Sequence, residues 1–133
     1  SKHRTMSNSD TPIYDPLTGA YSRALLADQL RAEVDRVQRY GQPCSLLVFD
    51  LDHFKSVNDA FGHARGDAVL AELASRVQQT KRTSDLLFRY GGDEFVVLLP
   101  STSKADAIRL AERLLVAVRD VPFGGGAPLS RKN

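Results

Sequence analysis

The sequence of 133 residues contains a single cysteine, Cys44, so it cannot form an internal disulfide, and we expect a reducing, cytoplasmic location. No apolar run approaches the roughly 20 residues that a membrane-spanning helix needs. The polar start, SKHRTMSNSD, lacks the apolar core of a signal peptide. No segment repeats. These absences predict a globular domain with no membrane segment in this chain.

A basic folded surface is also lacking. The net charge of +2 comes from basic residues near the two ends of the chain: Lys2, Arg4, Arg131 and Lys132. Residues 11–130 contain 14 basic and 15 acidic residues, whereas a nucleic-acid-binding domain usually presents a basic face. We therefore expect neither DNA nor RNA as a partner.

The length fits one domain, because domains typically have about 100–150 residues. We expect residues 1–13 to be a linker or an expression remnant, residues 14–123 to form the domain, and the glycine-rich residues 124–133 to form a flexible tail without a further element.

Local patterns predict helices alternating with strands. Ser22 is a candidate N-cap for a helix that ends near Tyr40, before Gly41. An apolar strand follows, and a pair of short apolar runs joined by Gly91-Gly92 is typical of a β-hairpin. The predicted strands are 45–52, 86–90 and 95–99, and the predicted helices are 22–40, 53–63, 66–80 and the segment after 103. The fold class is therefore α+β, a small, mostly antiparallel sheet covered by helices. Three strands make a thin sheet, which suggests that a strand is missing.

Acidic residues lie at two places that structure alone does not require. Asp50 and Asp52 end the first predicted strand, and Asp93 and Glu94 follow the two glycines. If the strands are neighbours, Asp50 and Asp93 converge on one Mg²⁺ that takes its other ligands from water and phosphates. The glycines would let phosphates approach the backbone. The alternative is that these acids only form turns.

Other polar residues have ordinary explanations when each is taken alone. Asn58, His63 and Asp67 fit loops or caps, and Lys55 fits a solvated surface. Arg82 and Asp85 fit an i, i+3 surface ion pair worth a few tenths of a kcal/mol.

Taken together, these residues resemble a known family. The segment 89–95, RYGGDEF, is similar to the signature of the GGDEF domains, the diguanylate cyclases. Residues 15–23, 49–59 and 61–67 (DPLTGAYSR, FDLDHFKSVND and FGHARGD) resemble three further motifs of that family. The four motifs stand in the family's order and spacing, and the resemblance covers residues 14–122. It implies a nucleotidyl cyclase, ferredoxin-like fold.

The resemblance implies that two GTP molecules condense into cyclic di-GMP with release of two pyrophosphates, in a cytoplasmic homodimer. By position, Asp50, the Leu51 carbonyl and Asp93 would bind Mg²⁺, with Mn²⁺ as a substitute, and Asp93 would accept the hydroxyl proton. Glu94 would be a supporting acid. The implied substrate-binding residues are Lys55, Asn58, His63, Asp67, Gly91 and Gly92.

The spacing of Arg82 and Asp85 before the hairpin resembles the family's RxxD site, where the product binds and inhibits. Two departures from the family stand out. Ser22 replaces a usual asparagine, and we expect the family's C-terminal strand and helix, with their phosphate-binding Lys and Arg, to be lacking. Leu129–Lys132 only vaguely resembles that strand. The alternative hypothesis is therefore an inactive receptor for GTP or cyclic di-GMP. A third hypothesis is a protein-interaction module with a degenerate site.

Overall fold

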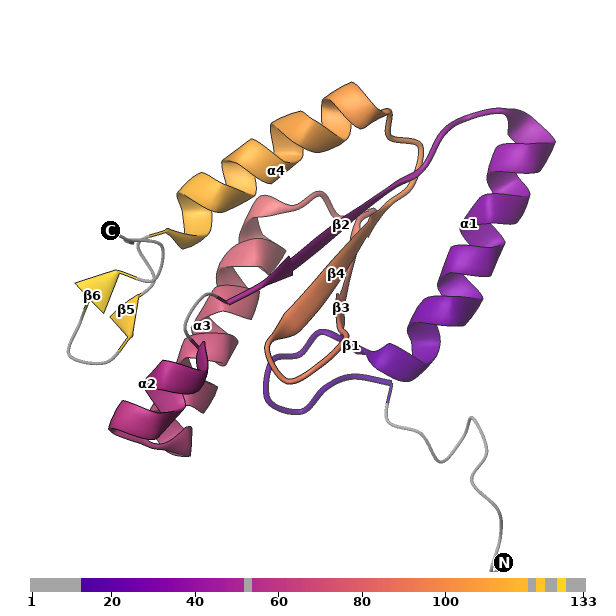
Figure 1. Cartoon of the computed structure of the whole chain (residues 1–133). Coiled ribbons are helices and arrows are strands. Elements are labelled where there is room, and N and C mark those ends of the chain that lie inside the picture. The colour runs from indigo at the N-terminus through magenta and orange to yellow at the C-terminus, as the bar shows by residue number, and fades with distance from the viewer. Residues whose placement is uncertain (1–12, 52–53, 120–121, 124–126, 129–133) are drawn as a thin grey trace, which may run out of the picture.

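A mixed four-stranded sheet organises the chain in the computed structural model, which describes residues 13–51, 54–119, 122–123 and 127–128 (Figure 1). The strand order is β1-β3-β4-β2. Both pairs made by β4 are antiparallel, and β1 runs parallel to β3. The strands are β1 (Tyr21–Ser22), β2 (Ser45–Asp50), β3 (Leu86–Arg89) and β4 (Glu94–Leu99). The expected α+β class and mostly antiparallel sheet are confirmed.

Helices cover both faces of this sheet. A 3-10 turn at Arg23–Leu25 leads into α1, which lies on one face, while α3 and α4 lie on the other (Figure 1). The short α2 links β2 to α3. The helices are α1 (Leu26–Tyr40), α2 (Phe54–Phe61), α3 (His63–Thr80) and α4 (Lys104–Val118), and a small separate hairpin pairs β5 (Pro122–Phe123) with β6 (Ala127–Pro128).

The strand β4 explains how the sheet is buried on both sides. Phe95, Val97 and Leu99 join the core formed with α3 and α4, whereas Val96 and Leu98 join the core beneath α1. Side chains of a strand alternate between faces, so a continuous apolar run is required where both faces are covered. This run ends at the β3–β4 turn, where polar residues can reach solvent.

The strand β2 is an edge strand within the described residues. Two apolar side chains on its outer face, Leu46 and Val48, are 43% and 73% exposed. On the other face, a cavity of about 320 Å³ lies between β2, α3 and α4, lined by apolar side chains such as Leu47, Phe49 and Leu114.

Several sequence expectations were wrong in detail. The strand β1, beside β3, was not expected at Tyr21–Ser22, and the side chain of Ser22 does not cap a helix. The helix α3 begins at His63 rather than Gly66, because Gly62 adopts φ +91° and turns the chain directly from α2. The strand β6 lies where no element was expected. Asp52, the segment 1–12 and Leu129–Lys132 lie outside the described residues.

Candidate active site

The end of β2 and the β3–β4 turn form the candidate site. Asp50 pairs directly with Glu94 across the sheet, and the Leu51 amide donates a hydrogen bond to the Asp93 carbonyl oxygen at 3.3 Å. Directly opposed strand residues carry their side chains on the same face, with Cβ atoms about 5 Å apart. The structure therefore brings together Asp50 and Glu94 as opposed residues, and Leu51 and Asp93 through their backbones.

The carboxylates at this site form no ion pair within the part of the chain that the structure describes. Asp50 and Glu94 are exposed, and Asp93 is half-buried. Like charges directly opposed across a sheet are destabilising. A divalent cation would remove that repulsion, so this donor set fits Mg²⁺. In the described part of the chain, no three His, Cys, Asp or Glu side chains are grouped so that they could hold a metal ion. Water and phosphate oxygens would have to complete the shell.

The two turn glycines differ in what they permit. The amides of Tyr90 and Gly91 both donate to the Glu94 carbonyl oxygen, at 2.8 and 3.2 Å. A Cβ on Gly91 would lie 2.5 Å from Glu94 Oε1, so Gly91 leaves room for that carboxylate. A Cβ on Gly92 would meet nothing within 4 Å. Gly92 is thus the position at which a ligand finds open backbone.

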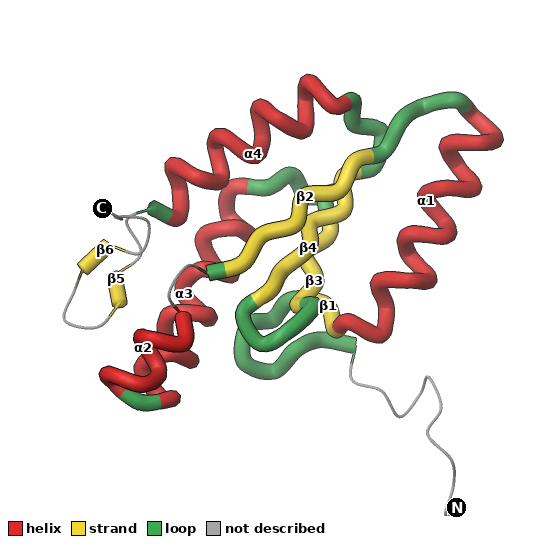
Figure 2. The backbone as a smooth tube through the Cα atoms, viewed as in Figure 1, coloured by secondary structure: helices red, strands yellow, loops and turns green. Residues whose placement is uncertain are grey.

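Arg89 fixes the β3–β4 turn through hydrogen bonds to its backbone carbonyls. Its guanidinium donates from Nε to the Gly91 carbonyl oxygen at 3.3 Å and from Nη2 to that of Gly92 at 2.7 Å. Its Nη1 donates to both carboxylate oxygens of Asp15, at 3.2 and 3.1 Å. Figure 2 shows the loop before β1 beside the β3–β4 turn, both in green. Two segments far apart in sequence therefore share one arginine.

Asp15 is itself held by the loop that contains it. Thr18 donates to Asp15 Oδ2 from its amide at 2.9 Å and from its hydroxyl at 2.7 Å. Burial acts to raise the pKa of Asp15, but the hydrogen bonds from Thr18 and Arg89 outweigh it, so the pKa lies below its ordinary value. The carboxylate stays charged and keeps Arg89 in place.

The expected base-recognition residues lie on α2 and the first turns of α3, at the same end of the sheet as the turn (Figure 1). Asn58 is half-buried between these helices, while Lys55, His63 and Asp67 are exposed. The Oδ1 atom of Asn58 is buried and has no hydrogen-bond partner in the described part of the protein. The structure thus gathers these residues on one helical hairpin.

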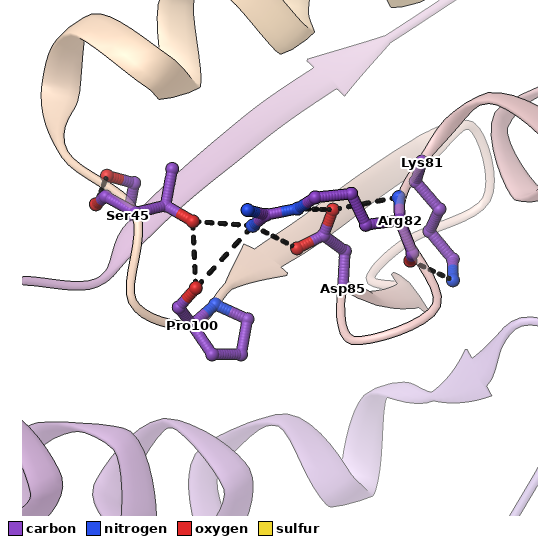
Figure 3. A network of polar contacts seen from close by, with 6 residues as sticks. Ser45, Lys81, Arg82, Asp85 and Pro100 are labelled. Atoms are coloured by element: carbon purple, nitrogen blue, oxygen red, sulfur yellow. Dashed lines mark hydrogen bonds and ion pairs between the residues drawn. The ribbon is translucent and has the colours of Figure 1, made fainter.

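Arg82 and Asp85 lie at the opposite end of β3 and are bound to each other (Figure 3). Asp85 is 0% exposed and accepts from Arg82 Nε at 2.9 Å and Nη2 at 2.6 Å. The same guanidinium donates to the hydroxyl of Thr102 and the carbonyl of Pro100. The hydrogen bond to Asp85 raises the pKa of Arg82 above its ordinary value. The pair expected from the sequence exists, but its aspartate is in the interior.

Sequence reasoning missed three contributors to these sites: Asp15 and Arg89 as a pair, and Thr102. Asp15 and Arg89 are 74 positions apart, so no local spacing relates them. Both lie within the motifs that resemble the family, and this was the feature of the sequence that could have drawn attention to them.

No helix in the described ranges is long and apolar enough to cross a membrane.

Comparisons with known proteins agree with this geometry. The family described as "Diguanylate cyclase, GGDEF domain" matches residues 12–124. The chain is 47% identical over 111 residues to the response regulator PleD of Caulobacter vibrioides, covering 84% of this chain and 24% of PleD. It is 48% identical over 119 residues to the diguanylate cyclase DgcP of Pseudomonas aeruginosa, covering 89% of this chain and 18% of DgcP. The chain therefore spans a quarter or less of these relatives.

Solved structures show the same fold. The diguanylate cyclase SiaD of Pseudomonas aeruginosa, in complex with its activator SiaC, superposes with a TM-score of 0.82 at 42% identity, covering 90% of this chain and 46% of SiaD. The GGDEF domain of DgcB from Caulobacter crescentus, in complex with c-di-GMP, gives a TM-score of 0.80 at 27% identity, covering 96% of this chain and 72% of that one. With its motifs, its fold and its acid-lined turn, the chain belongs to the GGDEF domain family of diguanylate cyclases.

Proposed function

We propose that this chain condenses two GTP molecules into cyclic di-GMP. In each half-reaction the 3′-oxygen of one GTP bonds to the α-phosphorus of the other, and the bond from that phosphorus to the β-phosphate oxygen breaks. Pyrophosphate leaves, and the hydroxyl proton passes to the Asp93 carboxylate. The observation that supports the proposal is the set of acids at the β2 end and the β3–β4 turn that form no ion pair with another described residue.

Asp50, the Leu51 carbonyl and Asp93 would hold Mg²⁺, or Mn²⁺ in its place. The ion would neutralise charge that develops on the transferred phosphate. Glu94 supports this set as the direct partner of Asp50. Arg89 keeps the turn carbonyls turned toward itself, which leaves the exposed side of the turn to the nucleotide.

Substrate recognition is divided between the turn and the α2–α3 hairpin. Gly91 and Gly92 would admit the phosphates, and Lys55 on α2 would contribute a positive charge. His63 would line the nucleotide site. These residues position the α-phosphate, and positioning accounts for much of the catalysis of phosphoryl transfer.

Asn58 and Asp67 would read the base. A carboxylate accepts from the N1–H and the 2-amine of guanine, and adenine lacks that donor pattern. A site built for those donors rejects adenine because its buried polar groups would be left unpaired, at about 1–3 kcal/mol each. Because each half-reaction needs a second GTP, the active species would be a homodimer with facing sites, in the cytoplasm where GTP is available.

Incubation of the purified protein with GTP and Mg²⁺, followed by separation of nucleotides by chromatography, tests the proposal. Cyclic di-GMP and pyrophosphate are expected with GTP, and no cyclic product with ATP or after chelation of the metal. Tight GTP binding with no product would instead support a nucleotide receptor.

We also propose product binding at Arg82 and Asp85. The Arg82 side chain is 44% exposed while Asp85 is fully buried, so the outer edge of the guanidinium is the group that a guanine or phosphate can reach. Asp85 would hold that edge in place. Calorimetric titration of cyclic di-GMP into the parent and the Arg82→Ala variant tests this. Weaker binding and relieved inhibition are expected, and identical isotherms would leave Arg82 with a purely structural role.

A further inference from the structure

Gly66 lies on α3 at the point where α2 packs against it, and it is buried. A Cβ added there would lie 1.8 Å from Asn58 Oδ1 and 3.0 Å from Asn58 Cγ, with Phe54 Cζ at 3.3 Å. The Asn58 amide therefore occupies the volume that any side chain at position 66 would need.

The backbone does not require glycine at this position. The described glycines with positive φ are Gly19, Gly41 and Gly62, and Gly66 has ordinary helical geometry. Glycine inside a helix is less favourable than alanine, because it loses more backbone freedom on folding. What Gly66 offers in return is space for Asn58.

That space decides where the Asn58 amide points. Its Oδ1 is buried without a hydrogen-bond partner among the described residues, so packing rather than bonding holds it. The backbone cannot retreat easily, because the Asn58 carbonyl accepts from the Gly62 amide at 2.8 Å and the Gly62 carbonyl accepts from the Gly66 amide at 3.2 Å. With Oδ1 against α3, the amide nitrogen points away from that contact.

We infer that Gly66 is a specificity-determining residue that positions the Asn58 amide for guanine. The inference rests on the proposed function and deepens it. An amide N–H₂ donates to the O6 acceptor of guanine, whereas adenine presents an amine donor at that position. Asp67, the next residue on α3, supplies the complementary acceptor for N1–H. Donor and acceptor together match guanine and oppose adenine.

A double-mutant cycle tests this, using Asn58→Ala, Gly66→Ala and the combined variant. The measured quantity is the ratio of dissociation constants for non-reacting α,β-methylene analogues of ATP and GTP, in the presence of Mg²⁺. We expect Gly66→Ala to lower the preference for GTP about tenfold, to the level of Asn58→Ala. In the Asn58→Ala background the added methyl group meets no amide, so it should change the preference less than twofold.

A second readout is independent of nucleotide. The side-chain amide resonances of Asn58 should shift in Gly66→Ala, and the unfolding midpoint of the combined variant should exceed that of Asn58→Ala because alanine favours the helix. If Gly66→Ala retains the parental preference while Asn58→Ala loses it, the inference is overturned and the proposed function stands. Losses that multiply in the combined variant also overturn it. A parent that binds both analogues equally would refute the proposed base recognition itself.

Discussion

Acidic residues at the two ends of the strand pair β3 and β4 differ in burial and in their partners. At one end, Asp85 is completely buried and receives two charged hydrogen bonds from Arg82. At the other end, Asp50 and Glu94 face each other across the sheet with no basic side chain bound to them among the described residues. One end of this strand pair therefore holds an acid that the protein satisfies, whereas the other end, together with the end of β2, holds acids that form no ion pair among the described residues.

The difference separates an acid that the fold itself satisfies from acids that only a group from outside can satisfy. A buried carboxylate without a partner costs free energy, so Asp85 needs Arg82 for stability, and the exposed edge of that guanidinium is still open to the proposed product. Opposed exposed acids gain nothing from each other, and their repulsion is relieved only by a group from outside the described fold. Acids left in this way at a glycine turn are the feature to expect of a site that binds a cation and phosphates.

The largest effect is expected at the β3–β4 turn, from Asp93→Ala. Loss of a metal ligand together with the proton acceptor should lower cyclic di-GMP synthesis by at least about a hundredfold. The free energy of unfolding should change by less than about 1 kcal/mol, because Asp93 makes no side-chain bond to another described residue. Product chromatography and urea unfolding measure the two quantities. A variant with parental turnover would contradict the role of Asp93.

At the end that holds Asp85, Arg82→Ala should lower stability, whereas Asp93→Ala at the other end should lower activity and leave stability nearly unchanged. Removing the guanidinium leaves Asp85 buried with little compensation, so the variant should lose about 2–4 kcal/mol of stability in urea unfolding. The matched control is Arg109→Ala, which breaks an i, i+3 pair with Asp106 whose side chains are 64% and 57% exposed. The control should change stability by less than about 0.5 kcal/mol. Equal effects of the two variants would show that the burial of Asp85 does not matter.

Much of this arrangement could be predicted from the sequence, because its signals are local. The apolar run of β4, the two turn glycines and Gly41 after α1 each act within a few residues. Gly41 adopts φ +81° at the end of α1, as a helix stop requires. The spacing of Arg82 and Asp85 predicted their pairing. It could not predict the burial of Asp85, because Pro100 and Thr102, which close over the pair, come 18 and 20 residues after Arg82.

The remaining features depend on distant partners. β1 has only two residues and is a strand because Tyr21 and Ser22 pair with Phe88 and Arg89. Ser22 looks like a helix cap, yet its hydroxyl is buried without a partner in the described part of the chain, whereas Ser103 caps α4 by accepting from the Asp106 amide at 3.2 Å. Local preference alone does not distinguish these two serines.

The smallest effect is expected at Asp15, which binds Arg89 and through it the β3–β4 turn. Asp15→Asn keeps the shape of the side chain but removes its charge toward Arg89, at an expected cost of about 1 kcal/mol at pH 7. The pKa of Asp15 is lowered in the folded protein, so its contribution is present above the unfolded value of about 3.9 and disappears as the pH falls through the lower folded value. Unfolding free energies of parent and variant should therefore converge below about pH 4.

Asp28→Asn is the matched control for that prediction, because Asp28 forms an i, i+3 pair with Arg31 in which both side chains are more than half exposed. Its effect should stay within about 0.5 kcal/mol at every pH. Because Arg89 also holds the carbonyls of Gly91 and Gly92, Asp15→Asn should in addition lower turnover several-fold while binding of the α,β-methylene GTP analogue changes little. A pH-independent difference between Asp15→Asn and the parent would mean that the carboxylate charge does not support Arg89. Unchanged turnover would mean that the turn keeps its geometry without this pair.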